Sequence, residues 1–303
     1  MTVEVLLMQV FNGLSLGSIL LLVGLGLGIT FGIMGVINFA HGEFLMIGAY
    51  MTYLTQIVFS HYVRPELMGL YFAAALPVSF LGAALIGFLL EKTLIRFLYG
   101  QPFETMLATW GVSLILQQMA RSIFGANNVE VVSPSWLRGA WKVTAGLQLP
   151  YNRLFIIFLS SFCIVGMYLY LYRSAPGRRI RAVMQNRSMS ACLGIPTGKI
   201  DAFTFALGSG LAGVAGYAVS LLGSIGPSTG QNYIIDSFMV VVLGGVGRLA
   251  GTIAGAVLIG TFSSIFEFIT TSSMGKVIVF ALVIIFLQWK PQGLFFLKSR
   301  RLD

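Results

Sequence analysis

Charged residues are scarce in this sequence. Only 10% of its 303 residues are charged, whereas about a quarter are charged in a typical soluble domain. Hydrophobic residues make up 57% of the chain, and its mean hydropathy is +0.88. A water-soluble fold has no interior large enough to bury so much apolar surface. The composition therefore excludes an ordinary soluble protein and indicates that the lipid bilayer is the surrounding medium.

Cysteine is also rare. Cys163 lies in an apolar run and Cys192 in a basic segment, which predicts different depths in the membrane and no disulfide between them. The N-terminus carries one charge, Glu4, before its first apolar run and lacks the basic region of a signal peptide. We therefore expect a retained first helix.

Motifs for nucleotide hydrolysis and catalysis are missing. Residues 194–199 read GIPTGK, with three residues between the glycines, and Ile200 stands where a phosphate-binding loop needs Ser or Thr. Gly208, Gly210 and Gly213 have dinucleotide-site spacing, but they lie in an apolar run without a preceding strand and indicate helix packing. No catalytic triad, metal cluster or carboxylate pair is recognisable. We expect no bound cofactor, no metal and no enzymatic activity.

Long apolar runs dominate what is present. A run of about 20 residues crosses the roughly 30 Å hydrocarbon layer, and shorter runs are typical of half-helices. The pattern predicts an all-α polytopic membrane protein with about 8 to 10 transmembrane or half-membrane helices, forming one domain over residues 1–303. The second, fourth, seventh and last of the expected spans are the weakest. These spans are 6–30, 33–58, 67–90, 104–124, 151–172, 202–225, 234–247, 249–269 and 275–289.

The basic residues predict the topology. The net charge is +9, which in a soluble protein would suggest nucleic acid, but here most Lys and Arg residues fall on one side of the predicted membrane. Cytoplasmic loops are enriched in Lys and Arg. We therefore expect an external N-terminus, a cytoplasmic C-terminus, a basic cytoplasmic loop at 173–199 and no nucleic-acid partner.

One compact polar group lies within apolar surroundings, at residues 38–43. Polar side chains inside a membrane are costly and mark solute pathways. Asn38, His41 and Glu43 are therefore candidate pathway residues, and Gly42 permits a helix interruption whose backbone groups meet solute. The alternative is that the group only caps and packs a helix.

A second polar group precedes the seventh span. Gln231, Asn232 and Asp236 are candidate pathway residues. Asp236 has an alternative interpretation, because a carboxylate in the first turn of a helix is stabilised by the helix dipole.

Glycines recur near this span. Gly247, Gly251 and Gly255 follow one another at every fourth position, which places them on one helix face and predicts close helix packing, with a backbone-lined pore as the alternative. The wider set expected to pack helices comprises Gly244, Gly245, Gly247, Gly251 and Gly255.

Three segments carry a family resemblance. INFAHGEFLMIGAY (37–50), GRRIRAVMQNRSMSACLGI (177–195) and VVLGGVGRLAGTIAGA (241–256) resemble permeases of branched-chain amino acid ABC importers. Within that family, GQNYIIDSFMVVVLGGVG (230–247) and NNVEVVSPSW (127–136) are similar to the urea permease branch. The resemblance implies urea as the solute, and a branched-chain amino acid is the alternative.

The resemblance also implies a multi-pass location in the bacterial plasma membrane and a set of partners. These are a second related permease subunit, two cytoplasmic subunits that bind and hydrolyse ATP, and an external solute-binding protein. A helix-like stretch at 177–194, within the loop at 173–199, matches the coupling helix that contacts an ATPase, with Arg178, Arg179, Arg181 and Ala182 at the contact. It departs from the commonest pattern because Met184, Gln185 and Asn186 stand where acidic residues often occur.

Two other classes remain as rivals. A passive urea or amide channel would need a continuous selective pore and no ATPase, and the basic cytoplasmic loop argues against it. A proton-coupled transporter would use His41 and Glu43.

Overall fold

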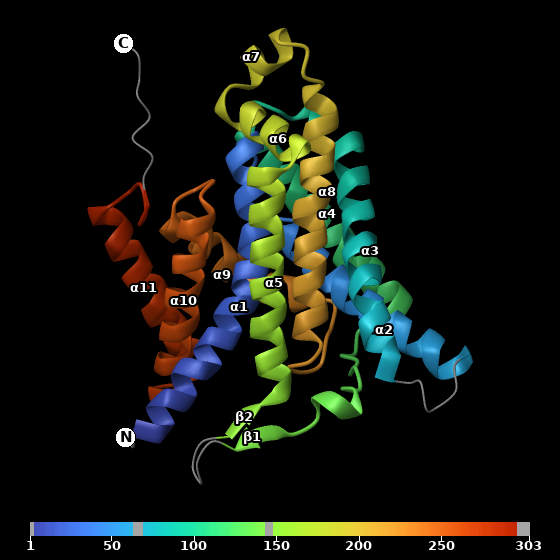
Figure 1. Cartoon of the computed structure of the whole chain (residues 1–303), viewed down its shortest axis with the longest axis vertical. Coiled ribbons are helices and arrows are strands. Elements are labelled where there is room, and N and C mark those ends of the chain that lie inside the picture. Colours follow the sequence, from blue (N-terminus) through green and yellow to red (C-terminus); the bar gives the residue numbers. More distant parts are fainter. Residues whose placement is uncertain (1–2, 63–68, 143–147, 296–303) are drawn as a thin grey trace.

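The computed structural model describes residues 3–62, 69–142 and 148–295. These residues form eleven α-helices, one β-hairpin and short 3₁₀ turns at η2 (Ile95–Phe97) and η3 (Ser135–Leu137). The long helices run roughly along one axis, and α1 begins at the end of the molecule opposite α6 and α7 (Figure 1). The expected all-α polytopic class is confirmed.

Within the described ranges, six helices are long and apolar enough to cross a membrane. The last of them was expected to be weak, but its window has a mean hydropathy of 1.8 over 18 residues, so that expectation is wrong. The six are α1 (Val3–Met34), α3 (Tyr71–Thr93), α5 (Tyr151–Arg173), α8 (Thr197–Val219), α10 (Leu249–Ile269) and α11 (Ser272–Trp289).

Three further helices fall short of a straight apolar crossing. They are α2 (His41–Tyr62), α4 (Pro102–Phe124) and α9 (Thr229–Gly244). At 16 residues α9 is roughly 24 Å long, less than the hydrocarbon thickness. These are the second, fourth and seventh of the nine expected spans.

The boundary between the first two spans was expected near residue 33, and this prediction is wrong. Helix α1 continues to Met34, and Gly35 then takes a φ of 62°, a left-handed conformation that glycine adopts without strain. An extended link follows, and α2 begins only at His41.

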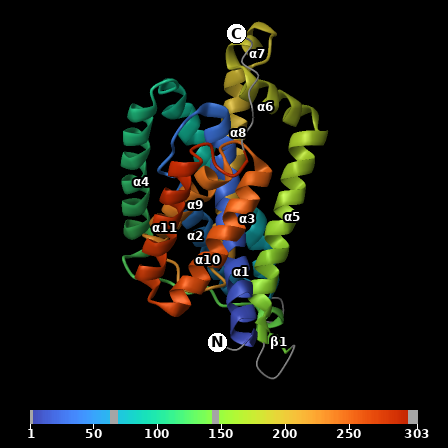
Figure 2. The same ribbon diagram turned by 90° about the vertical axis from the view of Figure 1, so that its left-hand side faces the viewer.

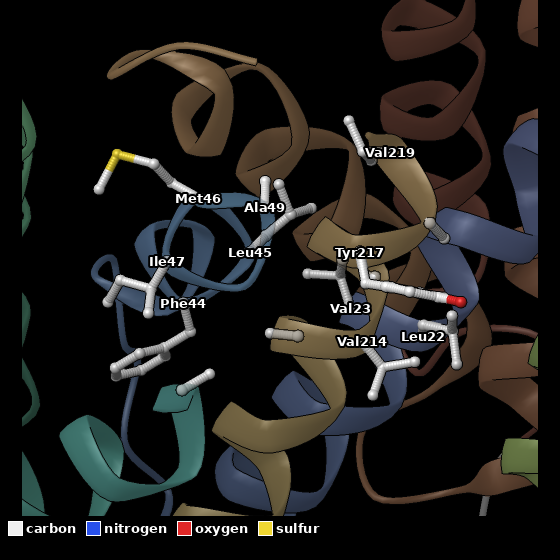
Figure 3. Close-up of a cluster of buried hydrophobic side chains, with 14 of the residues drawn as sticks. Leu22, Val23, Phe44, Leu45, Met46, Ile47, Ala49, Val214, Tyr217 and Val219 are labelled. Atoms are coloured by element: carbon white, nitrogen blue, oxygen red, sulfur yellow. The ribbon is translucent and has the colours of Figure 1, made fainter. Parts of the chain in front are cut away.

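The core forms where α1, α2 and α8 cross. In Figure 3, Leu22 of α1, Phe44 of α2 and Tyr217 of α8 lie in one apolar cluster. Glycine permits the close contact between α2 and α8, since a Cβ on Gly48 of α2 would lie 2.1 Å from the carbonyl oxygen of Gly213 on α8. In the apolar windows of α1 and α8, 83% and 89% of residues are buried, against 28% in α3. Helices α1 and α8 are therefore central and α3 is peripheral.

The loops contain more structure than expected. Loop 173–199 folds into α6 (Ala175–Gln185) and α7 (Arg187–Cys192), and β1 (Ala140–Lys142) pairs with β2 (Gln148–Pro150). The hairpin lies at the end of the molecule opposite α6 and α7 (Figure 1). The two ends therefore carry different folded elements.

Candidate functional site

Helix α2 begins inside the membrane layer. The Nε2 atom of His41 lies 3.2 Å from the carbonyl oxygen of Val23 on α1. At 1.5 Å per residue, Val23 is roughly 30 Å from the start of α1 and roughly 17 Å from its end. The extended link is turned by Asn38, whose Oδ1 accepts a hydrogen bond from the amide of Ala40 at 3.0 Å. The break between α1 and α2 therefore brings polar side chains to membrane depth.

The Glu43 carboxylate joins α2 to α4. Its side chain is buried, and its Oε1 atom accepts hydrogen bonds from Ser113 Oγ at 2.9 Å and Gln117 Nε2 at 2.8 Å. One turn nearer the start of α4, the Thr109 Oγ1 atom accepts a hydrogen bond from the amide of Phe39 at 3.1 Å. Polar groups thus attach α4 to the link and to α2 at this level, while the stacked rings of Tyr50 and Phe124 join the same two helices further along.

Helix α9 begins beside the same carboxylate. A Cβ on Gly230 would lie 2.5 Å from the carbonyl oxygen of Gly42 and 2.9 Å from Glu43 Oε2. Glu43 is the third residue of α2, and Gly230 the second of α9. Free amides at a helix N-terminus stabilise a negative charge. Two helix N-termini therefore explain how a carboxylate is accommodated at this depth.

Three polar atoms of this cluster have no hydrogen-bond partner among the described residues. They are Asn38 Nδ2, His41 Nδ1 and Glu43 Oε2, all buried. An unsatisfied buried polar group costs about 1–3 kcal/mol. The cluster thus offers a donor, an acceptor and an imidazole nitrogen of either character to a small polar molecule.

The three expected pathway residues of α9 are not part of this cluster. Gln231 and Asn232 are exposed on the first turn of α9. Asp236 Oδ2 lies 3.5 Å from Lys276 Nζ on α11. Of the α9 segment, Gly230 and Ile234 approach Gly42 of the cluster.

The glycines of α9 and α10 have two roles. A Cβ on Gly251 would lie 2.0 Å from the carbonyl oxygen of Gly244, and one on Gly255 would lie 2.6 Å from that of Val240. Gly245 and Gly247 instead form the turn between the helices, with φ angles of 95° and 79°. The close packing and the turn together hold α9 against α10.

The expected coupling residues lie on different faces of α6. Arg178 and Arg179 are exposed. Ala182 is half-buried, and the Arg181 guanidinium lies over the Tyr172 ring, 4.7 Å from its centroid. A docking protein would therefore meet the first two arginines, whereas Arg181 is turned toward α5.

The sequence reasoning missed the α4 side chains. Thr105, Thr109, Ser113 and Gln117 are all buried and follow one another at every fourth position. That periodic polar stripe in an otherwise apolar segment was a readable signal. What it faces was not readable, because Glu43 is 70 residues from Ser113.

An ionic cluster was missed as well. Arg187 Nη2 of α7 lies 2.6 Å from Asp201 Oδ2 of α8, and the Arg187 guanidinium lies 4.2 Å from the centre of the Tyr99 ring. The Tyr99 hydroxyl donates to Glu91 Oε1 at 2.8 Å. Burial, with the nearby Asp201 and Glu91 charges, raises the pKa of Tyr99, so its hydroxyl remains a donor. This cluster ties the loop helices to α3 and α8.

Comparison with known proteins shows the family. A family model described as branched-chain amino acid transport system / permease component matches residues 9–287. The chain is 30% identical to the high-affinity branched-chain amino acid transport system permease protein BraD of Pseudomonas aeruginosa, over 95% of each chain. It is 29% identical to the corresponding protein LivH of Escherichia coli, over 95% of this chain and 94% of that one.

A second kind of permease is also similar. The high-affinity branched-chain amino acid transport system permease protein LivM of Escherichia coli is 26% identical, over 92% of this chain and 68% of that protein. No solved structure matches. The urea branch expected from residues 230–247 finds no support in these relatives, which are named for branched-chain amino acids. The chain belongs to the family of branched-chain amino acid transport system permease components.

Proposed function

We propose that this chain is a permease subunit of an ATP-driven importer of branched-chain amino acids. The observation that carries the proposal is the family match over residues 9–287, together with full-length relatives named as permeases for these solutes. The alternative named at the outset thus replaces urea as the main hypothesis.

The proposed transporter contains two related permease subunits, two ATP-binding subunits on the cytoplasmic side and an external solute-binding protein. Similarity to both LivH and LivM supports a pair of different but related permeases. The membrane end that carries α6 and α7 is then cytoplasmic, and α1 begins on the external side. The cytoplasmic C-terminus also belongs to this proposal, because residues 296–303 lie outside the described part of the chain.

We place the ATPase contact at α6. Arg178 and Arg179 are exposed there, and the buried face of the helix is formed by Gly177, Ile180 and Val183. The ionic cluster of Arg187 and Asp201 gives a route from this segment to α8. Closure of the ATPases would move α6 and α7, and with them the ends of α3 and α8.

We place the solute pathway at the start of α2 and α9. Transporters place solute where interrupted helices begin at membrane depth, because helix N-termini and free backbone groups are available there. The cluster of Asn38, His41 and Glu43 has this arrangement. His41 and Glu43 are not hydrogen-bonded to each other, since His41 faces α1 and Glu43 faces α4. This separation argues against a direct proton relay between them.

Urea is the second candidate, and one observation favours it. The unpartnered atoms Asn38 Nδ2 and Glu43 Oε2 complement a neutral solute with N–H donors and a carbonyl acceptor. Ser113 and Gln117 bring no positive charge to the cluster to bind the carboxylate of an amino acid, although the charge of the exposed Arg121, one turn further along α4, acts on Glu43.

The test is uptake by the complete transporter in vesicles. We expect ATP-dependent uptake of labelled leucine that unlabelled isoleucine and valine suppress. Urea uptake without leucine uptake would move the specificity to the second candidate. Uptake that persists without ATP and without the binding protein would contradict an ABC importer and favour a passive channel. Collapse by an uncoupler while ATP is maintained would favour proton coupling.

A further inference from the structure

A cavity of about 650 Å³ lies beneath α6, at the end of the molecule opposite the hairpin. Its floor is formed by α1, including Gly28 and Ile29, and its sides by α5 and α10. Arg181 of α6 and Arg248 of the α9–α10 turn both line it. Both α5 and α10 pack on α1, and Figure 2 shows α1 between them. We call this space the α6 cavity.

The polar part of the α6 cavity is cationic and lacks a counter-ion. Two guanidinium groups line it, and none of its lining residues is acidic. Among the described residues no carboxylate forms an ion pair with Arg181 or Arg248. The Nε atom of Arg181 is buried without a hydrogen-bond partner. A buried donor without a partner is costly, so the cavity, with two arginines and no acidic residue, has the electrostatics of an anion site.

The start of α10 adds to this preference. Helix α10 runs for 21 residues from Leu249, directly after Arg248, and Leu249 and Thr252 line the cavity. The first amides of a helix carry partial positive charge and bind phosphate groups. Arginine binds phosphate through two parallel N–H donors. One phosphate within reach of both arginines and this helix start would satisfy all of them.

Most of the rest of the lining is apolar, although Tyr172 and Gln185 also line the cavity. Leu25, Ile29 and Leu171 come from membrane-spanning helices, and Met184 covers them from α6. A free phosphate makes no favourable contacts with an apolar surface, whereas a phospholipid has both an anionic head group and acyl chains. Basic pockets between membrane helices bind acidic lipid head groups in this way.

We infer that the α6 cavity binds an acidic phospholipid, with its phosphate between Arg181 and Arg248 and its chains along α1. The lipid then occupies the space beneath the segment proposed to contact the ATPase, beside the contact of Met184 with Gly247 of the α9–α10 turn. The inference goes beyond the proposed function, because it assigns a ligand that is not transported.

The test measures lipid retention by the full-length chain, purified from membranes that contain phosphatidylglycerol. We expect the wild-type chain to retain phosphatidylglycerol through extensive washing, and the Arg181→Ala/Arg248→Ala variant to retain about tenfold less, the effect of losing roughly 1.4 kcal/mol of binding. The matched control is Arg178→Ala/Arg179→Ala, which removes the same charge from the exposed face of α6 and should retain lipid as the wild type does. The Arg181→Lys/Arg248→Lys variant, which keeps both charges, should retain an intermediate amount.

A second measurement guards against misfolding and identifies the source of the anion. Phosphatidylglycerol vesicles should raise the melting temperature of the wild-type chain relative to phosphatidylcholine vesicles, and this difference should vanish in the Arg181/Arg248 variant while its melting in phosphatidylcholine is unchanged. Equal lipid retention by the variant, or equal loss in the control, would overturn the proposal. Equal stabilisation by inorganic phosphate in phosphatidylcholine vesicles would also overturn it, because the site would then bind a free anion. None of these results depends on transport, so failure here is distinguishable from failure of the proposed function.

Discussion

Two buried polar clusters in this molecule are built on opposite principles. At the start of α2, Glu43 accepts two hydrogen bonds from α4, yet three buried polar atoms remain unpartnered. Beneath α7, Asp201 is matched with Arg187, and Glu91 with the Tyr99 hydroxyl. The second cluster is held by its own internal pairs. The first leaves three buried polar atoms without a partner, which supports the solute pathway proposed there.

The largest effect is expected from breaking the ion pair of the second cluster. Arg187→Ala leaves the Asp201 carboxylate, whose side chain is 2% exposed, without its cation. We expect a loss of about 3 kcal/mol in the free energy of unfolding, at the low end for buried pairs because the Arg187 side chain is 41% exposed. Denaturant unfolding in detergent measures it.

Asp201→Asn is the matched control for this pair. It leaves behind an arginine that can turn to water, so it should cost less than Arg187→Ala. Equal costs would show that the two residues do not act as an asymmetric buried pair.

The next effect concerns the contact that brings α9 to the first cluster. Gly230→Ala places a Cβ 2.5 Å from the carbonyl oxygen of Gly42, and overpacking of this kind costs about 1–3 kcal/mol. Gly111→Ala on α4 is the control, because a Cβ there meets no atom within 4 Å. The control should stabilise the helix by up to about 1 kcal/mol. Melting temperatures that shift in the same direction in both variants would contradict the close approach of α2 and α9.

A smaller effect on stability but a clear effect on transport is expected at Glu43. Glu43→Gln keeps the shape of the side chain and removes its charge. We expect uptake by the assembled transporter to fall about tenfold, equivalent to roughly 1.4 kcal/mol, while the melting temperature changes little. Ser113→Ala removes one hydrogen bond to the same oxygen and should reduce uptake less. Unchanged uptake in Glu43→Gln would place the solute elsewhere.

The last effect is expected at Tyr99 and concerns stability alone. Tyr99→Phe removes the hydroxyl that donates to Glu91 and keeps the ring beneath the Arg187 guanidinium. A hydrogen bond to a charged acceptor contributes about 1.5–3 kcal/mol, so unfolding should become easier by about 1.5 kcal/mol, with uptake per folded transporter unchanged. Reduced uptake without lost stability would instead indicate that this cluster takes part in transport.

Sequence patterns alone predicted much of the scaffold. The nine predicted spans correspond to nine long helices among the described residues, six of which are long and apolar enough to cross a membrane, because a bilayer demands about 20 apolar residues for each crossing. The polar group at residues 38–43 was identified as a candidate site because polar side chains at membrane depth are expensive. The helical character of residues 177–194 was also recognised, although the break at Asn186 was not.

Contacts between distant segments were beyond sequence reasoning. Nothing local to Asp236 indicates that its partner is Lys276, so this ion pair was not predicted. Likewise, the periodic polar stripe of α4 predicts a buried face but does not say that Glu43 is what it meets.

The sequence by itself determined that the chain is a membrane protein and where its helices lie. It also determined which polar residues would be costly to place at membrane depth. These properties follow from composition and from periodicity along a single segment. Only the tertiary structure decided that α2 and α9 begin side by side at the Glu43 carboxylate. It also decided that Arg181 faces a cavity while Arg178 faces outward. Those outcomes depend on how closely backbones approach at Gly42 and Gly230, and such an approach is a property of two packed helices rather than of either sequence alone.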